Sequence, residues 1–222
     1  MVACEDRPMV LDTSRQIIDQ WIGTWVHLRG ITTSEVDGHR LVHVAGPSRE
    51  TELICVDPGV ADMLRLTQHV AHDPRAMLTV VADDVGPYLT TRLPSGVRID
   101  RDDETLMSTR LVDHPIPALP DDLTFRWDVV GHGTTYTLES GQSIAAVGTV
   151  GVRGQVATFD RVETMPAFQR RGLGRHVMAA LTVQAMGRGA THGVLAATAQ
   201  GRQLYSSLGW RDRLEMLSLM GT

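Results

Sequence analysis

A basic turn punctuated by glycines separates a strand-like segment from a helix-like segment in the last third of the chain. It comprises seven residues, Gln169, Arg170, Arg171, Gly172, Leu173, Gly174 and Arg175. The strand pattern covers residues 156–164 and the helical pattern runs from about residue 172 to residue 186. The first N–H groups of a helix lack partners within the helix, and its dipole adds positive charge at that end. Because glycine allows the backbone to approach an anion closely, we expect this turn to bind a phosphate or pyrophosphate.

Two better-known phosphate-binding turns do not match this segment. A dinucleotide fingerprint needs three glycines and an acidic residue about 20 positions later, whereas a nucleoside-triphosphate loop needs lysine followed by Ser or Thr. The chain contains no lysine, since all 21 of its basic residues are arginine. The sequence therefore argues against both nucleotide-binding motifs.

In this region the chain resembles the GCN5-related N-acetyltransferases (GNAT family), which hold the pyrophosphate of acetyl-CoA with a Gln/Arg-x-x-Gly-x-Gly/Ala turn. The residues that match the turn are Gln169, Arg171, Gly172 and Gly174. A second match follows a strand-like run at 193–197 and a helix-like run at 198–208. There Tyr205, Leu208, Gly209 and Trp210 resemble the Tyr-x-x-Leu-Gly-Phe ending of the family. Two matches at the expected separation make the resemblance specific.

The resemblance implies direct transfer of an acetyl group from acetyl-CoA, without a metal, to the primary amine of a small or amino-acid-like acceptor. Tyr205 is expected to protonate the departing thiolate, and N–H groups within 162–165 to polarise the carbonyl. Thr198 stands where many members carry an asparagine that contacts the cofactor. The residues expected to bind the cofactor are Val162, Glu163, Thr164, Gln169, Arg170, Arg171, Gly172, Leu173, Gly174, Arg175, Thr198, Arg202 and Tyr205.

Two carboxylates on the strand before the turn are candidates for the general base. Strand alternation predicts that Asp160 and Glu163 lie on opposite faces, so that at most one faces the amine. We prefer Glu163 as the catalytic base because it is nearer the expected acyl position. Pairing of either carboxylate with an arginine, and bound water as the base, remain alternatives.

The elements around the turn indicate an α/β (α+β) protein with the GNAT fold, a central mixed and mostly antiparallel sheet flanked by helices. Strand patterns at 124–130, 134–139, 143–152 and 156–164 predict an antiparallel meander that leads into the turn. Three prolines within 114–120 predict a linker. The expected domains are therefore an amino-terminal α/β region (1–114), a linker (115–121) and a GNAT catalytic core (122–222).

The amino-terminal region is organised as an α/β unit. A helix is expected where apolar residues recur between Ile17 and Val26, capped by Thr13 or Ser14 and ended by Gly30. Strands are expected at 40–45, 51–56, 76–82 and 97–111, with a helix near 60–70. The run that begins at Tyr88 resembles the segment 205–219, so the region is predicted to be a degenerate copy of half an acetyltransferase fold. An unrelated α/β unit is the alternative.

The turn of this predicted copy, residues 57–59, offers one glycine, no arginine and the acidic Asp57. An acid there would repel a pyrophosphate. We therefore expect one CoA per chain, and expect the amino-terminal half to supply a wall of the substrate cleft.

Composition and charge narrow the function classes further. The chain has 222 residues and a net charge of −5, with 11 Arg against 18 Asp plus Glu in 1–116 and 10 against 8 in 117–222. The sequence has no arginine-rich tract with interleaved aromatic residues, which argues against a nucleic-acid partner. Glu5 and Asp6 are acidic and no long apolar run is present, so we expect neither a secretory signal nor a membrane partner. The expected location is therefore the cytoplasm. A homodimer is compatible with the sequence.

The cysteines and histidines suggest neither disulfides nor a metal. Only Cys4 and Cys55 are present, so we expect no disulfide framework and a buried Cys55. His39 and His43 fall in a predicted strand, where their spacing does not build a helical metal site. The leading interpretation is an acetyl-CoA-dependent N-acetyltransferase. The alternatives are a non-catalytic CoA or acyl-CoA sensor or assembly module, and an acyltransferase with a larger donor such as aminoacyl-tRNA, against which the acidic first half argues.

Overall fold

The computed structural model describes residues 13–222, so Cys4, Glu5 and Asp6 lie outside the described residues. Its strands are β1 Thr32–Val36, β2 His39–His43, β3 Thr51–Val56, β4 Ala76–Ala82, β5 Val97–Arg110, β6 Thr124–Val130, β7 Gly133–Ser140, β8 Ser143–Arg153, β9 Val156–Thr164, β10 His192–Ala197 and β11 Arg211–Gly221. Its helices are α1 Ser14–Arg29, α2 Val60–Leu66, α3 Gly86–Leu89, α4 Leu173–Gly187 and α5 Ala199–Ser207, with 3-10 turns at Thr67–His69 and Pro166–Phe168.

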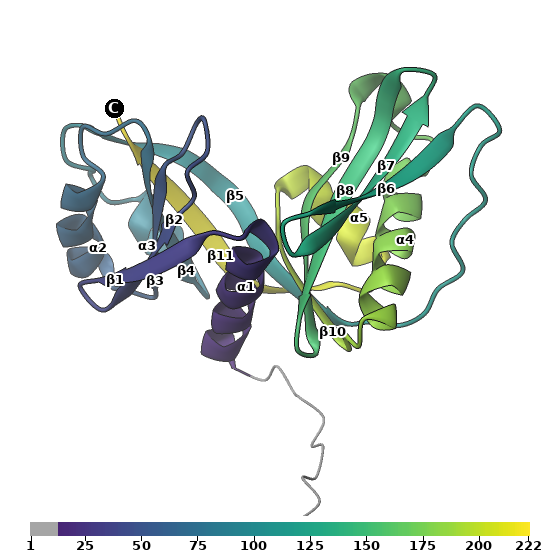
Figure 1. Ribbon diagram of the computed structural model, residues 1–222. Helices are drawn as coiled ribbons and strands as arrows, with labels where there is room; N and C mark the ends of the chain where they lie inside the picture. The colour runs from purple at the N-terminus through teal and green to yellow at the C-terminus, as the bar shows by residue number, and fades with distance from the viewer. Residues whose placement is uncertain (1–12) are drawn as a thin grey trace, which may run out of the picture.

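All eleven of these strands form one sheet, in the order β1-β2-β3-β4-β11-β5-β10-β9-β8-β7-β6 (Figure 1). The pairs β3–β4 and β9–β10 are parallel, and the other pairs are antiparallel. This arrangement confirms the predicted mixed, mostly antiparallel sheet. The meander of β6 to β9 and the strands β4, β5 and β10 also lie where their sequence patterns predicted them.

The centre of the sheet is built by an exchange of strands between the two halves of the chain. The last strand, β11, lies between β4 and β5 of the first half, and β5 lies between β11 and β10. Residues 111–123, which include the proline-rich segment, form neither helix nor strand. The sheet therefore continues across the predicted linker, and the first half borders the second directly.

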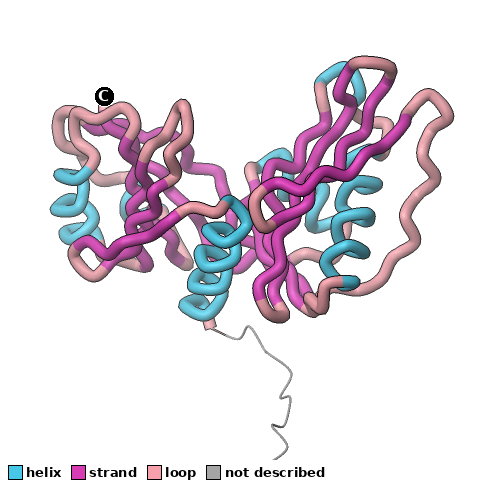
Figure 2. Tube along the Cα trace, in the orientation of Figure 1, coloured by secondary structure: helices cyan, strands magenta, loops and turns pink. Residues whose placement is uncertain are grey.

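Helices cover both faces of the sheet, as the two views show (Figures 1 and 2). On one face α1 packs against residues from strands of both halves, including Val81, Val156 and Val194. On the opposite face α2 and α3 cover the first half, while α4 and α5 cover the second. α1 therefore packs across strands of both halves, and α5 also contacts β5 of the first half. Every helix within residues 13–222 is too short or too polar to span a bilayer.

Capping residues at both ends of α1 fix its length, and two glycines in the sheet allow it to pack closely. Thr13 and Gln16 form a capping box, and Gly30 ends the helix with φ +63°. Leu28, in the last turn, is buried against the paired glycines Gly133 and Gly151 of β7 and β8. A Cβ at Gly151 would lie 2.7 Å from the Cβ of Leu28, so glycine is what admits the helix.

Two strands were not predicted from the sequence, the edge strand β1 and the carboxyl-terminal strand β11. β1 is an exposed edge strand of mainly polar residues, and its pattern did not predict a strand. The hairpin to β2 turns at Asp37 and Gly38, which have φ of +52° and +78°. Asp-Gly is a strong hairpin signal, because both central positions of a type I′ turn need positive φ. The Asp37–Gly38 dipeptide was the sequence signal from which this hairpin could have been predicted.

Candidate functional site

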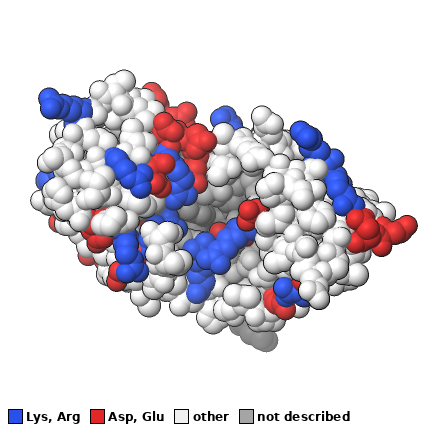
Figure 3. Space-filling view, turned by 90° about the horizontal axis from the view of Figure 1, so that it is seen from above, with Lys and Arg blue, Asp and Glu red and all other residues white. Residues whose placement is uncertain are grey.

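A cleft of about 730 Å³ opens over the sheet and is lined by both halves of the chain. One side is contributed by α1, β5 and the segment from Arg49 to β3, and the other by β9, the basic turn, α4 and α5. The space-filling view from above shows the hollow, with basic and acidic side chains along it (Figure 3). Within the described residues, the amino-terminal half therefore supplies a wall of the cleft, as the sequence predicted.

The basic turn lies at the amino end of α4, facing this cleft. Gly172 is the N-cap residue, with φ +77°, and no side chain caps the helix. The first helical hydrogen bond is donated by His176 N–H to the carbonyl of Gly172. The N–H groups of Leu173, Gly174 and Arg175, which precede it and also line the cleft, have no partner within the helix. A Cβ at Gly172 would meet no atom within 4 Å. This open space beside free donors fits a bound anion.

The arginines of the turn differ in their surroundings. Arg170 and Arg175 line the cleft, and Arg175 also donates to Ser207 Oγ at 3.1 Å. Arg171 instead forms two hydrogen bonds with the carboxylate of Asp122, at 2.6 and 2.9 Å. Arg202 is similarly paired with Asp212. Neither Arg171 nor Arg202 lines the cleft, unlike the other residues expected to bind the cofactor.

β9 and β10 separate where the cleft deepens. Their parallel pairing ends at Thr158 and Val194, although β9 continues to Thr164. Val162, Glu163 and Thr164 line the resulting gap. The N–H of Met165 is donated to the carbonyl of Ala145 on the β8 side, so alternation directs the N–H groups of Thr164 and Val162 towards the gap. The strand therefore presents backbone donors where they could polarise a carbonyl.

The expected placement of Asp160 and Glu163 on opposite faces is wrong, because β9 contains a bulge. Arg161 has φ +51°, and the pairing with β8 shifts register there. Phe159 and Val162 consequently both pack into the core beneath α4. Asp160 comes directly after Phe159, and Glu163 directly after Val162. The side chains of Asp160 and Glu163 therefore both lie on the other face of the strand. Both line the cleft.

These two carboxylates have different partners. Asp160 forms an ion pair with Arg29 of α1 at 2.8 Å, with both side chains 20% exposed. Among the described residues, no ion pair involves Glu163. Asp160 therefore ties α1 to β9, and Glu163 keeps a carboxylate available within the cleft.

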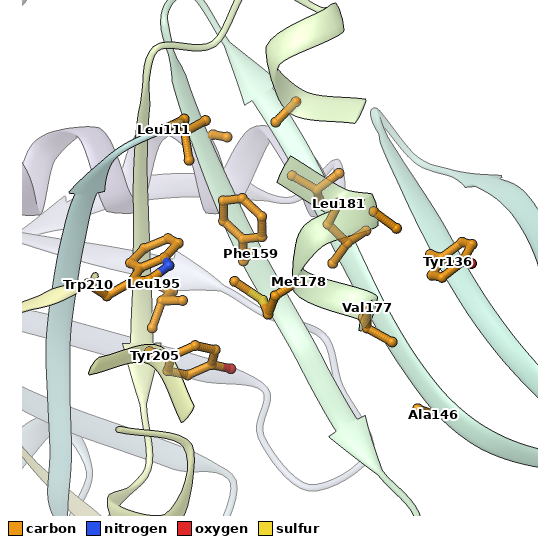
Figure 4. Close-up of a cluster of buried hydrophobic side chains, with 14 of the residues drawn as sticks. Leu111, Tyr136, Ala146, Phe159, Val177, Met178, Leu181, Leu195, Tyr205 and Trp210 are labelled. Carbon is orange, nitrogen blue, oxygen red and sulfur yellow. The ribbon is translucent and has the colours of Figure 1, made fainter. Parts of the chain in front are cut away.

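Tyr205 lies on α5 at the edge of the core, next to Trp210, with its hydroxyl on the side away from that indole (Figure 4). It is 7% exposed and lines the cleft. Burial, with a smaller contribution from Asp160, raises the pKa of Tyr205 to about 12. The phenol therefore carries its proton at neutral pH. Thr198 caps α5 by accepting the N–H of Gly201 at 3.2 Å, and it also lines the cleft.

The sequence did not reveal the side chains that the amino-terminal half contributes to the cleft. They are Trp21, Trp25, Arg29, Arg49, Glu52, Arg101 and Glu104. The indoles of Trp21 and Trp25 stack at 5.8 Å, and Arg29 and Arg49 lie over the Trp25 ring at 5.1 and 5.7 Å. No local motif marks these residues, since they meet only when α1 docks across the sheet.

Comparison with known proteins gives a family match to the part of the chain that carries most of this site. A family model described as "Acetyltransferase (GNAT) family" matches residues 100–210, half of the chain. No curated protein matches.

Solved structures show the same fold over nearly the whole chain. A GCN5-related N-acetyltransferase from Kribbella flavida superposes with a TM-score of 0.66 at 15% identity, covering 96% of each chain. A GCN5-related N-acetyltransferase-like protein from Streptococcus suis has a TM-score of 0.60 at 13% identity, covering 92% of this chain and 96% of its own. A tandem GNAT protein from the clavulanic acid biosynthesis pathway has a TM-score of 0.51 at 13% identity, covering 90% of this chain and 94% of its own.

Proposed function

The chain belongs to the acetyltransferase (GNAT) family, and on that premise we propose that it transfers an acetyl group from acetyl-CoA to the primary amine of a small acceptor. The observation that carries the proposal is the shared cleft. One space is lined by the uncapped amino end of α4, by the strands that separate after Thr158, and by Tyr205. These features match the three needs of the reaction, an anion site, carbonyl polarisation and a proton donor.

The turn has the features required to bind the pyrophosphate of CoA. The free N–H groups of Leu173 to Arg175 and the helix dipole supply donors and positive charge. Arg170 and Arg175 add two guanidinium groups at the cleft wall. In this proposal Arg171 acts indirectly, because its pair with Asp122 fastens the turn to the segment that precedes β6.

Acetyl-CoA supplies the activated thioester carbonyl when bound. The neutral amine nitrogen forms a bond to the carbonyl carbon, the carbon–sulfur bond breaks, and the sulfur leaves as a thiolate. The nitrogen, positively charged after the attack, releases one proton to water as the amide forms. We assign to the N–H groups of Val162 and Thr164 the role of stabilising the carbonyl oxygen as it gains charge. Tyr205, which is protonated at neutral pH, donates its proton to the thiolate.

Glu163 is our candidate for the group that removes the proton of the attacking ammonium. It shares the cleft face of β9 with Asp160, but no described residue forms an ion pair with it. Asp160 is less suited because Arg29 already holds its carboxylate. A carboxylate without a partner is the better acceptor of a proton.

We also propose that the first half of the chain is a degenerate copy of the second, with the domain boundaries predicted from the sequence. The order β3-α2-β4-α3-β5 parallels β9-α4-β10-α5-β11, and β3–β4 is parallel as β9–β10 is. In the first half, Tyr88 donates its hydroxyl to Asp57, at the start of the turn that leads into α2. That contact places an acid where a pyrophosphate would bind, which supports one CoA per chain.

The activity is tested by mixing the protein with acetyl-CoA and a panel of amines. A thiol reagent measures release of CoA, and mass spectrometry identifies the acetylated product. The proposal predicts release that depends on an amine and stops when the amine is omitted. CoA binding without release for any amine would identify the domain as a binding module instead.

A further inference from the structure

Two guanidinium groups converge on one side of the cleft, away from the basic turn. Nη1 of Arg49 lies 3.3 Å from Met77 Sδ, and Nη2 of Arg101 lies 3.5 Å from the same sulfur. Arg49 precedes β3 and Arg101 belongs to β5, so two separate segments bring them together. Both residues line the cleft, and their side chains are 19% and 38% exposed.

The N–H groups at this point are poorly satisfied. A thioether is a weak acceptor, whereas a guanidinium carries five donors arranged to bind a carboxylate or phosphate. Glu52 holds Arg49 at 2.7 Å and Glu104 holds Arg101 at 2.9 Å, both through Nη1, and Nε of Arg101 also donates to Asp100 at 3.3 Å. Nη2 of Arg101 has Met77 as its one partner among the described residues, and Nη1 of Arg49 shares its two N–H groups between Glu52 and Met77. The N–H group that each arginine directs at the sulfur therefore gains more from an incoming anion than from the sulfur.

The two carboxylates of this cluster are also unequal. Glu52 is buried and fully engaged, because its second partner is the hydroxyl of Thr79 at 2.6 Å. Glu104 uses Oε1 for Arg101, and no described residue bonds its Oε2. Burial raises the pKa of Glu104, with Arg101 acting in the opposite direction. Glu104 thus keeps one oxygen for a ligand.

The strand register places this cluster beside the reaction site. Thr105 of β5 pairs with Ala197 at the end of β10, and α5, which carries Tyr205, starts two residues later. Glu104 is the next residue along β5 and lines the same cleft as Tyr205. A small molecule bound at Arg49, Arg101 and Glu104 therefore lies on the acceptor side of the proposed thioester site.

We propose that the acceptor is an amine that also carries a carboxylate, and that Arg49 and Arg101 bind this carboxylate while Glu104 Oε2 accepts a hydrogen bond from the ammonium group. This assignment rests on the proposed function and names its substrate class. Arg49 and Arg101 balance Glu52 and Glu104, and Asp100, which also pairs with Arg101, is balanced by Arg98. A zwitterion therefore leaves the site neutral. A phosphate dianion would add uncompensated negative charge beside Glu52 and Glu104.

The net charge of the amino-terminal half favours the opposite assignment, because residues 1–116 carry 11 Arg against 18 acidic residues. That excess suits an acceptor with only positive charge. The cleft itself differs, since this half contributes Arg29, Arg49 and Arg101 to its lining. Local placement of the arginines, rather than overall charge, therefore decides the assignment.

The test compares three forms of each acceptor, a set of α- and ω-amino acids, their carboxamides and the corresponding decarboxylated amines. Binding to the CoA-loaded protein is measured by saturation-transfer NMR, and thiol release gives kcat and KM with acetyl-CoA. We expect at least one amino acid to bind roughly 10- to 100-fold more tightly than its carboxamide, because the carboxamide lacks the charge-assisted contact with the guanidinium forks. Equal binding of acid and carboxamide, preference for the decarboxylated amine, or binding of no acid would overturn the proposal.

Arg101→Lys keeps the positive charge next to Glu104, so we expect the variant to fold. It removes the guanidinium group that would bind a carboxylate through two N–H donors. It should raise the KM of the acid at least tenfold, reduce the ratio of acid to carboxamide binding, and leave kcat and CoA affinity unchanged. Arg65→Lys is the matched control, because Arg65 is 48% exposed, pairs with Asp37 and does not line the cleft. Equal effects of the two variants would contradict the assignment. Acid-selective binding without thiol release would refute the transferase activity and leave the carboxylate site standing.

Discussion

Replacing Gly172 by alanine separates the cost of an unusual backbone conformation from the loss of an anion site. Gly172 has φ +77°, and a Cβ there would meet no protein atom within 4 Å. Gly30, at the end of α1, has φ +63° and is equally open, but it does not line the cleft. Gly30→Ala is therefore a matched control, in which the conformational cost is the same and the proposed CoA site is untouched.

An L residue in the left-handed region costs about 1–2 kcal/mol. In a chain of this size each kcal/mol lowers Tm by about 2–4 °C, so both variants should lose about 2–8 °C. Only Gly172→Ala places a methyl group where, in the proposed function, the pyrophosphate would approach the N–H donors. Loss of one hydrogen bond to a charged group costs about 1.5–3 kcal/mol, which weakens CoA binding about 10- to 100-fold.

Calorimetric titration with CoA and thermal unfolding without ligand provide the two readouts. We expect the two variants to lose Tm equally, and Gly172→Ala to lose much more CoA affinity than Gly30→Ala. If both variants bind CoA as tightly as the unmodified protein, the anion-binding role of the turn is refuted. If both weaken it equally, the effect comes from stability and not from the site.

Three further predictions concern the proposed proton donor, the helix α1 that lines the cleft and the partly buried carboxylate of Glu104. Tyr205→Phe should lower kcat by about 10²- to 10⁴-fold with unchanged CoA affinity, and normal turnover would remove the proton-donor role. Leu28→Ala should destabilise the fold by about 2–5 kcal/mol in urea unfolding, because Leu28 fills the space over Gly133 and Gly151; a loss below 1 kcal/mol would show that α1 docks by other contacts. Glu104 has a raised pKa, so its contribution to stability is fully present below pH 4.5 and is lost as the pH rises through the folded-state pKa. The unfolding free energy of wild type relative to Glu104→Gln should therefore fall as the pH rises above 4.5, and a difference that rises with pH would contradict the desolvation of Glu104.

The basic turn was predictable because its signals are local. The free N–H groups of α4 follow a strand that ends shortly before a proline and a turn with two glycines. These signals lie within a few residues of one another and do not depend on contacts with distant parts of the chain. The pairing of Arg171 with Asp122 was not predictable in this way, since the two residues are 49 positions apart. The bulge at Arg161 also carries no signal, because arginine seldom adopts positive φ.

The acceptor side of the cleft required the tertiary structure. Arg49, Arg101 and Glu104 come together only because β5 lies between β10 and β11, at the centre of the sheet. Strand patterns gave β5 its correct range but not its neighbours. Pairing between distant strands depends on the packing of both faces, which a single sequence does not reveal.

A crystal structure with bound acetyl-CoA tests the central claim most directly. In that structure we expect pyrophosphate oxygens within hydrogen-bond distance of the N–H groups of Leu173 to Arg175. We also expect the thioester in the gap between β9 and β10, with its sulfur next to the Tyr205 hydroxyl. Acetyl-CoA bound elsewhere on the molecule, with this gap left empty, would contradict the account.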